Sequence, residues 1–226
     1  MSFIPPDYHC PLCPRLAQFL AQNREQYPGF YNGPVPSFGD MNAELLIVGL
    51  APGLNGANRT GRPFTGDYAG LVLYSALRKH GFAEGNYNPE QVQDGSGDGF
   101  RLINCRITNS VRCVPPQNKP ETSEIRQCNM FLKAEVAAMP ALKVLVSLGQ
   151  ISHKAVIQSF GLKQSQYVFG HGAVHMLPSG LCLINSYHSS RYNINTGTLT
   201  QAMFDDVIGL AQEKMLIPLS FQQRKC

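Results

Sequence analysis

The chain has 226 residues, of which 43% are hydrophobic and 15% are charged, and its formal net charge is +4. This composition excludes a disordered chain, and the longest apolar runs, such as residues 44–50, are too short to cross a bilayer. The first residues lack the basic start and apolar stretch of a secretion signal, so we expect a cytoplasmic protein. The length suits a single domain over residues 1–226. The mild positive charge suits a polyanionic partner without identifying one.

Apolar runs alternate with helical patterns from residue 44 onwards. Strands are predicted over residues 44–50, 100–108, 143–148, 168–177 and 181–184. Helices are predicted over residues 68–80, 121–139, 150–160 and 198–215. Strands that alternate with helices predict an α/β layered domain with a mainly parallel sheet.

Three stretches at the predicted strand ends carry polar or flexible residues. Leu50 to Gly53 follow the first strand, Asn109 closes the second, and Ser186 to His188 follow the last. Ligands of parallel sheets bind beyond the carboxyl ends of the strands. Three separate stretches at that edge therefore predict a pocket there.

Seven cysteines in a reducing compartment argue for metal binding, catalysis or burial rather than disulfides. Cys10 and Cys13 form a C-x-x-C motif, and Cys113 and Cys128 flank a second irregular loop. These four thiols can supply a site for zinc or for an iron–sulfur cluster, and their spacing does not separate the two. The other cysteines are interpreted as buried hydrophobes or as incidental: Cys105, Cys182 and Cys226.

The stretch from Gly49 to Asp67 is rich in Gly, Asn and Pro and is predicted to be a loop. It lacks the Gly-Lys-Ser/Thr of a Walker loop and the glycine spacing of a dinucleotide fingerprint. Its glycines let backbone amides approach a ligand closely. Phe64 either offers a flat face to a base or fills the core, and Arg59 and Arg62 can contact phosphates. Asp67 is either a helix N-cap or a functional carboxylate.

Taken together, these stretches resemble family 5, the type b branch, of the uracil-DNA glycosylases. The run from Gly49 to Asp67 is similar to the first motif of that family, and Phe169 to Gly172 and Ser186 to Thr200 are similar to later motifs. The four cysteines and the loop Cys113 to Pro120 resemble the cluster ligands that families 4 and 5 share. The resemblance covers nearly the whole chain.

The resemblance implies a three-layer α/β/α sandwich around a four-stranded, mainly parallel sheet. It implies a [4Fe–4S] cluster of structural role on the four cysteines. The implied activity is base-excision repair, in which the N-glycosidic bond of uracil, and of hypoxanthine or xanthine, is hydrolysed in DNA to leave an abasic site. Leu50 and Ala51 stand where many related glycosylases have an acidic or amide residue, and family 5 also lacks such a residue there. Ser189 stands where many relatives have a proline.

Two residues are the candidates for catalysis. The target base must first be rotated out of the duplex. His188 is then expected to donate a hydrogen bond to O2 of the leaving base as a neutral imidazole. Asp67 is expected to stabilise the positive charge that develops on the sugar and to orient the water. Asn55 or Asn58, in the same loop as Asp67, is the alternative holder of the water.

The base and the DNA have separate candidate contacts. Asn109 is expected to pair with the base and Phe64 to stack on it, while backbone amides near Ala51 and Gly53 contact its O2. Phosphates are expected to contact four loop cations: Arg59, Arg62, Lys119 and Arg191. Arg191 and its neighbour Tyr192 are candidates to fill the space that the base leaves.

Three other interpretations stay open. A family 4-like glycosylase restricted to uracil is one, and the apolar pair Leu50 and Ala51 argues against it. A non-catalytic iron–sulfur protein that binds lesions in DNA is the second, and the presence of both Asp67 and His188 favours an enzyme instead. A zinc-stapled nucleotide-binding domain is the third. Nothing in the sequence indicates an oligomer, so a monomer is expected.

Overall fold

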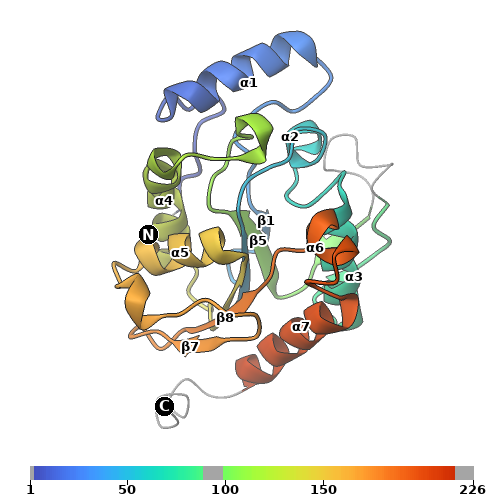
Figure 1. The fold of residues 1–226 in the computed structure, drawn as a ribbon, viewed down its shortest axis with the longest axis vertical. Coiled ribbons are helices and arrows are strands. Elements are labelled where there is room, and N and C mark those ends of the chain that lie inside the picture. Colours follow the sequence, from blue (N-terminus) through green and yellow to red (C-terminus); the bar gives the residue numbers. More distant parts are fainter. Residues whose placement is uncertain (1–2, 89–98, 217–226) are drawn as a thin grey trace.

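A central mixed sheet organises the chain in the computed structural model, which describes residues 3–88 and 99–216 (Figure 1). Within these residues the sheet has six strands in the order β1-β5-β2-β6-β8-β7. The inner four strands are parallel: β5 (Cys105–Asn109), β2 (Leu45–Gly49), β6 (Val144–Leu148) and β8 (Cys182–Ser186). The short strands β1 (Phe38–Gly39) and β7 (Val174–Met176) add antiparallel edges.

Helices cover both faces of this sheet. The inner strands are buried on both sides, as continuous apolar runs predict. Along β2, Leu45 and Ile47 pack in the same core cluster as residues of α3 (Tyr68–Lys79) and α7 (Gln201–Leu216). Leu46 and Val48 face the opposite layer, formed by α4 (Thr122–Ala137) and α5 (Gln150–Ser159). The predicted α/β layers and mainly parallel sheet are therefore confirmed. The sheet has six strands where the resemblance implies four, because the short antiparallel strands β1 and β7 extend its edges.

Two predicted strands are wrong in their extent. The strand predicted over 100–108 is interrupted, because Asn104 has a φ of +48° and separates β4 (Arg101–Leu102) from β5. β4 pairs instead with β3 (Ala83–Glu84) in a separate ribbon. Of the strand predicted over 168–177, only β7 forms a strand. The residues before β7 in this stretch include a turn, and the 3-10 helix η2 (Gln164–Gln166) precedes the stretch.

Several helices were not predicted. α1 (Pro14–Gln26) begins directly after Cys13, and its Leu16 and Leu20 pack against Val111 and Val114. The short helices are α2 (Ala57–Thr60) within the glycine-rich loop, η1 (Pro116–Asn118) and α6 (Arg191–Asn195). α1 thereby closes over the region that contains the paired cysteines.

Membrane crossing requires a long apolar helix, and no helix among residues 3–88 and 99–216 meets that requirement. Residues 89–98 and Cys226 lie outside the described residues. The single-domain assignment of residues 1–226 stays a prediction.

Candidate active site

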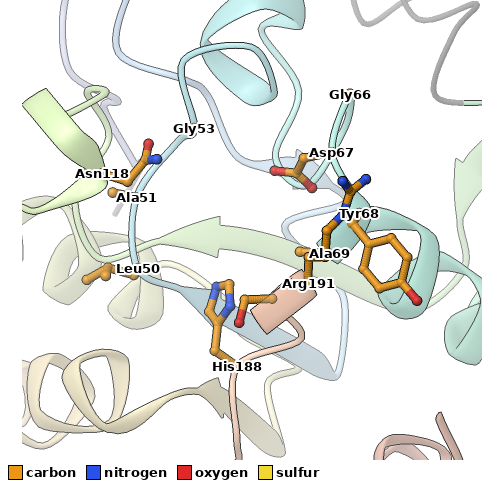
Figure 2. A pocket seen from close by; sticks show the side chains of 11 residues that line it. Leu50, Ala51, Gly53, Gly66, Asp67, Tyr68, Ala69, Asn118, His188 and Arg191 are labelled. Atoms are coloured by element: carbon orange, nitrogen blue, oxygen red, sulfur yellow. The ribbon is translucent and has the colours of Figure 1, made fainter. Parts of the chain in front are cut away.

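A cleft of about 480 Å³ lies beyond the carboxyl ends of β2 and β8 (Figure 2). Residues of three segments, 50–53, 66–69 and 188–191, line it together with Asn118. Two of these segments directly follow inner parallel strands, and the third begins α3. The cleft therefore lies at the sheet edge where the sequence places a pocket, and the structure brings Asp67 and His188 to its walls.

Asp67 is both the N-cap of α3 and a residue of the cleft. Its Oδ1 accepts a hydrogen bond from the backbone N–H of Gly70 at 3.1 Å. Burial raises the pKa of Asp67, and backbone hydrogen bonds from Gly70 and Ala69 oppose that rise. The two interpretations of Asp67 are thus compatible, because one carboxylate oxygen caps the helix while the side chain lines the cleft. A perturbed carboxylate in a cleft is typical of a functional residue.

The glycine-rich loop fits closely around the Asp67 carboxylate. A Cβ atom on Gly56 would lie 2.8 Å from Oδ2 of Asp67, and one on Gly53 would lie 3.7 Å from it. Gly56 is therefore required by close approach. Gly53 lines the cleft beside the carboxylate and leaves its own backbone accessible there.

His188 follows β8 and lines the cleft opposite the glycine-rich loop. Its backbone carbonyl accepts a hydrogen bond from Nδ2 of Asn193 at 2.8 Å, which ties the histidine to α6. Burial lowers the pKa of His188 below its ordinary value, so the imidazole is neutral at neutral pH. A neutral imidazole has one N–H donor, which is the form that the expected role requires.

Phe64 and Asn109 lie together against Gly49, at the end of β2. A Cβ atom on Gly49 would lie 2.6 Å from Cζ of Phe64 and closer still to Oδ1 of Asn109. Phe64 is 7% exposed and Asn109 3%. Phe64 has a φ of +55°, a strained backbone conformation for an aromatic residue of the kind that concentrates at functional sites. Its ring lies 6.2 Å from the His188 ring, which places Phe64 next to the cleft.

Three of the four expected phosphate contacts are at least partly accessible. Arg191 is exposed, lines the cleft and holds its guanidinium 5.4 Å from the centre of the Tyr68 ring. Lys119 is exposed beside Asn118. Arg59 is half-buried and its Nε donates to the Asn55 carbonyl at 3.1 Å.

The expectation that Arg62 contacts a phosphate is wrong. Its side chain is only 3% exposed, and its guanidinium lies 5.1 Å and 5.7 Å from the ring centres of Phe38 and Phe100. A buried guanidinium between aromatic rings stabilises the fold by cation–π contacts and does not face a phosphate. We therefore remove Arg62 from the candidate DNA-binding set.

Asn118 is the cleft residue that the sequence analysis missed. It lies in η1 with a φ of +57°, and its Oδ1 would lie 3.9 Å from a Cβ on Gly53. The two asparagines proposed as alternatives lie elsewhere: Asn58 is fully buried and donates to Asn32 Oδ1 at 2.9 Å, and Asn55 does not line the cleft. The signal that could have found Asn118 is its place between two prolines, where the chain must turn and asparagine tolerates a positive φ.

The fold brings together the four candidate ligand cysteines, which come from distant parts of the sequence. Cys10, Cys13, Cys113 and Cys128 line one small cavity between α1, α4 and the loop that follows β5. Burial, together with a smaller effect of the neighbouring Cys128, raises the pKa of Cys13 to about 11. Burial and the neighbouring cysteines also raise the pKa of Cys113 strongly. Within the described ranges, no group of three or more His, Cys, Asp or Glu side chains has an arrangement that could hold a metal ion.

Comparison with known families places this fold and cleft in a defined class. The family model of the uracil DNA glycosylase superfamily matches residues 36–211, which include the whole sheet from β1 to β8 and most of α7. The chain therefore belongs to the uracil DNA glycosylase superfamily, and its relatives place it in the type-5 group.

Relatives named type-5 uracil-DNA glycosylase match along most of their length. The chain is 43% identical to that of Thermus thermophilus over 204 residues, which are 88% of this chain and 90% of the relative. It is 34% identical to that of Pyrobaculum aerophilum over 88% of this chain and 86% of the relative. A relative from the same archaeon named type-4 uracil-DNA glycosylase is 34% identical over 63% of each chain.

Proposed function

We propose that this chain is a monofunctional DNA glycosylase that hydrolyses the N-glycosidic bond of uracil in DNA during base-excision repair. The observation that carries the proposal is that Asp67 and His188 line one cleft at the carboxyl edge of the sheet in a member of this superfamily. The names of the type-5 relatives support uracil as the substrate. The paired presence of both side chains favours excision over binding alone.

Bond cleavage sends the electrons of the glycosidic bond to the base and leaves positive charge on the sugar. His188 stabilises the negative charge at O2 of the base by donating its single N–H. Asp67 faces the sugar with the opposite charge, stabilises the cation and accepts a proton from the water that adds to C1′. Asn118 lies near Gly53 together with Asp67, so its side-chain oxygen is a second acceptor for that water.

The base occupies the part of the cleft between the glycine-rich loop and His188. Rotation of the base out of the duplex costs on the order of a few kcal/mol, and stacking on Phe64 recovers roughly 1–3 kcal/mol. Asn109 pairs with the edge of the base, and the backbone amides from Ala51 to Gly53 contact O2. Phe64 and Asn109 are nearly buried before DNA binds, so they must gain access to the base as it enters.

A wider substrate range is part of the proposal. Leu50 and Ala51 line the cleft without a polar side chain, so these two positions offer no side-chain hydrogen bond that selects uracil. Hypoxanthine and xanthine, the other deaminated bases, therefore remain substrates. The DNA backbone is held by Arg191, Lys119 and Arg59, and Tyr192, which is 75% exposed, lies next to Arg191 where it can enter the duplex.

The four cysteines line one cavity, although no three of the described side chains are arranged around a single metal ion. A [4Fe–4S] cluster takes its four thiolates on separate iron atoms, so this lining suits a cluster better than a lone ion. Burial raises the pKa of Cys13, Cys113 and Cys128, so these thiols by themselves are protonated and neutral at pH 7. Bound iron reverses this, because a cation next to a thiol removes its proton. We propose that Cys10, Cys13, Cys113 and Cys128 hold a [4Fe–4S] cluster that stabilises the fold around α1 and supplies no step of the reaction.

The cell compartment and the assembly state are proposals of the same kind. We propose a cytoplasmic protein, because seven cysteines suit a reducing compartment. We propose a monomer, because a glycosylase cleft formed by one chain needs no second copy to complete it.

A base-excision panel tests the function. Purified protein is incubated with labelled duplexes that each contain one uracil, hypoxanthine or xanthine, and abasic sites are revealed by alkaline cleavage. We expect cleavage of all three duplexes and no strand break before alkali. Cleavage of the uracil duplex alone would contradict the wider range, and binding without any cleavage would promote the lesion-binding alternative.

A further inference from the structure

A buried ion-pair cluster joins β5 and α4. Glu135 is fully buried, and its two carboxylate oxygens are contacted by Arg106 Nε at 2.7 Å and by Arg112 Nη2 at 2.5 Å. Burial opposes ionisation of Glu135, but the two arginines prevail and lower its pKa. The carboxylate is therefore charged. Two guanidinium groups against one carboxylate leave this group of three side chains with one positive charge in excess.

Arg112 connects this buried ion-pair group to the cysteines. It lines the same cavity as the four thiols, and its backbone N–H donates to Cys128 Sγ at 3.4 Å. Its side chain is 1% exposed, with Nη1 donating to Ser37 Oγ at 2.5 Å. Burial raises the pKa of Cys128, and the positive charge of Arg112 opposes that rise.

One polar atom of Arg112 has no partner. Among residues 3–88 and 99–216, its buried Nε–H meets no hydrogen-bond acceptor. A buried donor without an acceptor is unfavourable, because it has lost its hydrogen bonds to water and gained none in return. The protein thus holds an excess positive charge and an unused donor on a residue that lines the cysteine cavity. Both features suit a negatively charged sulfur-containing group in that cavity.

We propose that Arg112 is the buried counter-charge of the iron–sulfur cluster, with Glu135 and Arg106 fixing its position. The inference rests on the cluster proposed above. Four thiolate ligands give such a cluster a net negative charge, and the charge and hydrogen bonds around its sulfurs set its reduction potential. A positive charge held in a low-dielectric interior favours the reduced, more negative form of the cluster. Arg112 acts through the cluster and does not contact DNA.

The midpoint potential of the purified holoprotein tests this role. The cluster is titrated anaerobically against redox mediators and followed by its visible absorbance. Arg112→Gln removes the charge, so we expect the ratio of reduced to oxidised cluster at a fixed potential to fall roughly tenfold, a shift of about 59 mV for one electron. Arg112→Lys keeps the charge and should remain near the wild type. Glu135→Gln removes a negative charge and should shift the midpoint in the opposite direction.

An exposed arginine near the same ligand supplies the control. Arg126 lies two positions before Cys128 on α4 and is exposed, so solvent and salt screen it and Arg126→Gln should leave the midpoint unchanged. The proposal is overturned if iron-loaded Arg112→Gln keeps the wild-type midpoint, or if Arg112→Gln and Glu135→Gln shift it in the same direction. If Arg112→Gln does not fold, the sign of the Glu135→Gln shift decides.

Iron and sulfide analysis of the wild type separates this inference from the one beneath it. Wild-type protein without iron and acid-labile sulfide would remove the cluster itself. Wild-type protein with both, combined with unchanged potentials in the variants, would remove only the role of Arg112. Excision of uracil by the protein is measured separately, and neither of these two outcomes bears on it.

Discussion

The backbone N–H of Gly70 donates a hydrogen bond to Oδ1 of Asp67 at 3.1 Å, so the carboxylate of the cleft is also the N-cap of α3. The helix therefore fixes the side chain that the proposed reaction uses. Burial raises the pKa of Asp67, which means that its charged form is disfavoured in the folded protein. A charged group kept at a site that disfavours it indicates selection for function rather than for stability.

Asp67→Asn should separate the catalytic role of Asp67 from its structural one. Asparagine is as good an N-cap as aspartate, whereas Asp67→Ala should cost about 1 kcal/mol of unfolding free energy. A raised pKa means that the folded state binds the proton more tightly, so stability falls as the pH rises past that pKa. At pH 7 the Asn variant should therefore unfold at the same or a higher urea concentration. Its single-turnover excision of uracil should fall by at least about 100-fold.

The pH profile should report Asp67 and not His188. Burial lowers the pKa of His188 below 6.5, so the imidazole is neutral at neutral pH. We expect the single-turnover rate to fall in acidic solution as Asp67 takes up its proton, at a pH above the ordinary 3.8. His188→Gln should slow the reaction and keep the same acid limb. A limb centred at 6.5 that His188→Gln removes would contradict this assignment.

Gly56→Ala should disturb the site without altering the rest of the fold. Its Cβ would lie 2.8 Å from Oδ2 of Asp67 and 3.1 Å from the Thr65 carbonyl. Displacement of the carboxylate by an ångström can cost about 100-fold in rate, so we expect a loss of roughly 10- to 100-fold in single-turnover excision. Gly29→Ala is the matched control, because its Cβ meets nothing within 4 Å. Equal activity of both variants would show that Asp67 is not held by this loop.

Two arginines should differ in their effect on DNA binding. Arg191 is exposed at the cleft, so Arg191→Ala should weaken binding and lower the slope of log affinity against log salt by about 1. Arg62 is buried against Phe38 and Phe100. Arg62→Ala should cost about 2 kcal/mol of stability and leave the salt slope unchanged. Fluorescence anisotropy at several salt concentrations measures both slopes, and a reduced slope for Arg62→Ala would restore that residue to the DNA contacts.

The inner sheet could be predicted because its pattern is local. β2 and β6 are continuous apolar runs buried on both faces, and such runs indicate parallel strands without knowledge of their neighbours. The edge strand β1 is two residues long, which is too short to leave a pattern, and β7 is the three-residue part of the strand predicted over 168–177 that forms. α1 was missed because its core contacts rest on few apolar residues.

Part of the site was predictable because its residues closely follow a strand. His188 and Ala51 could be placed in the cleft because chain order fixes which strand ends share an edge. Arg62 could not be placed, because its burial depends on Phe38 and Phe100, which are distant in sequence. Asn118 enters the cleft through a left-handed turn in η1, whose direction no local pattern fixes.

The central claim is that this cleft removes uracil through Asp67, and single-turnover excision from a labelled duplex with one uracil tests it most directly. Wild-type protein, Asp67→Asn and the Gly29→Ala control are compared at equal DNA occupancy, with abasic sites revealed by alkali. The account predicts efficient excision by the wild type and the control, and at least about 100-fold slower excision by a folded, DNA-binding Asp67→Asn. A folded Asp67→Asn that excises uracil at the wild-type rate would contradict it, as would a wild-type protein that binds the duplex and releases no uracil.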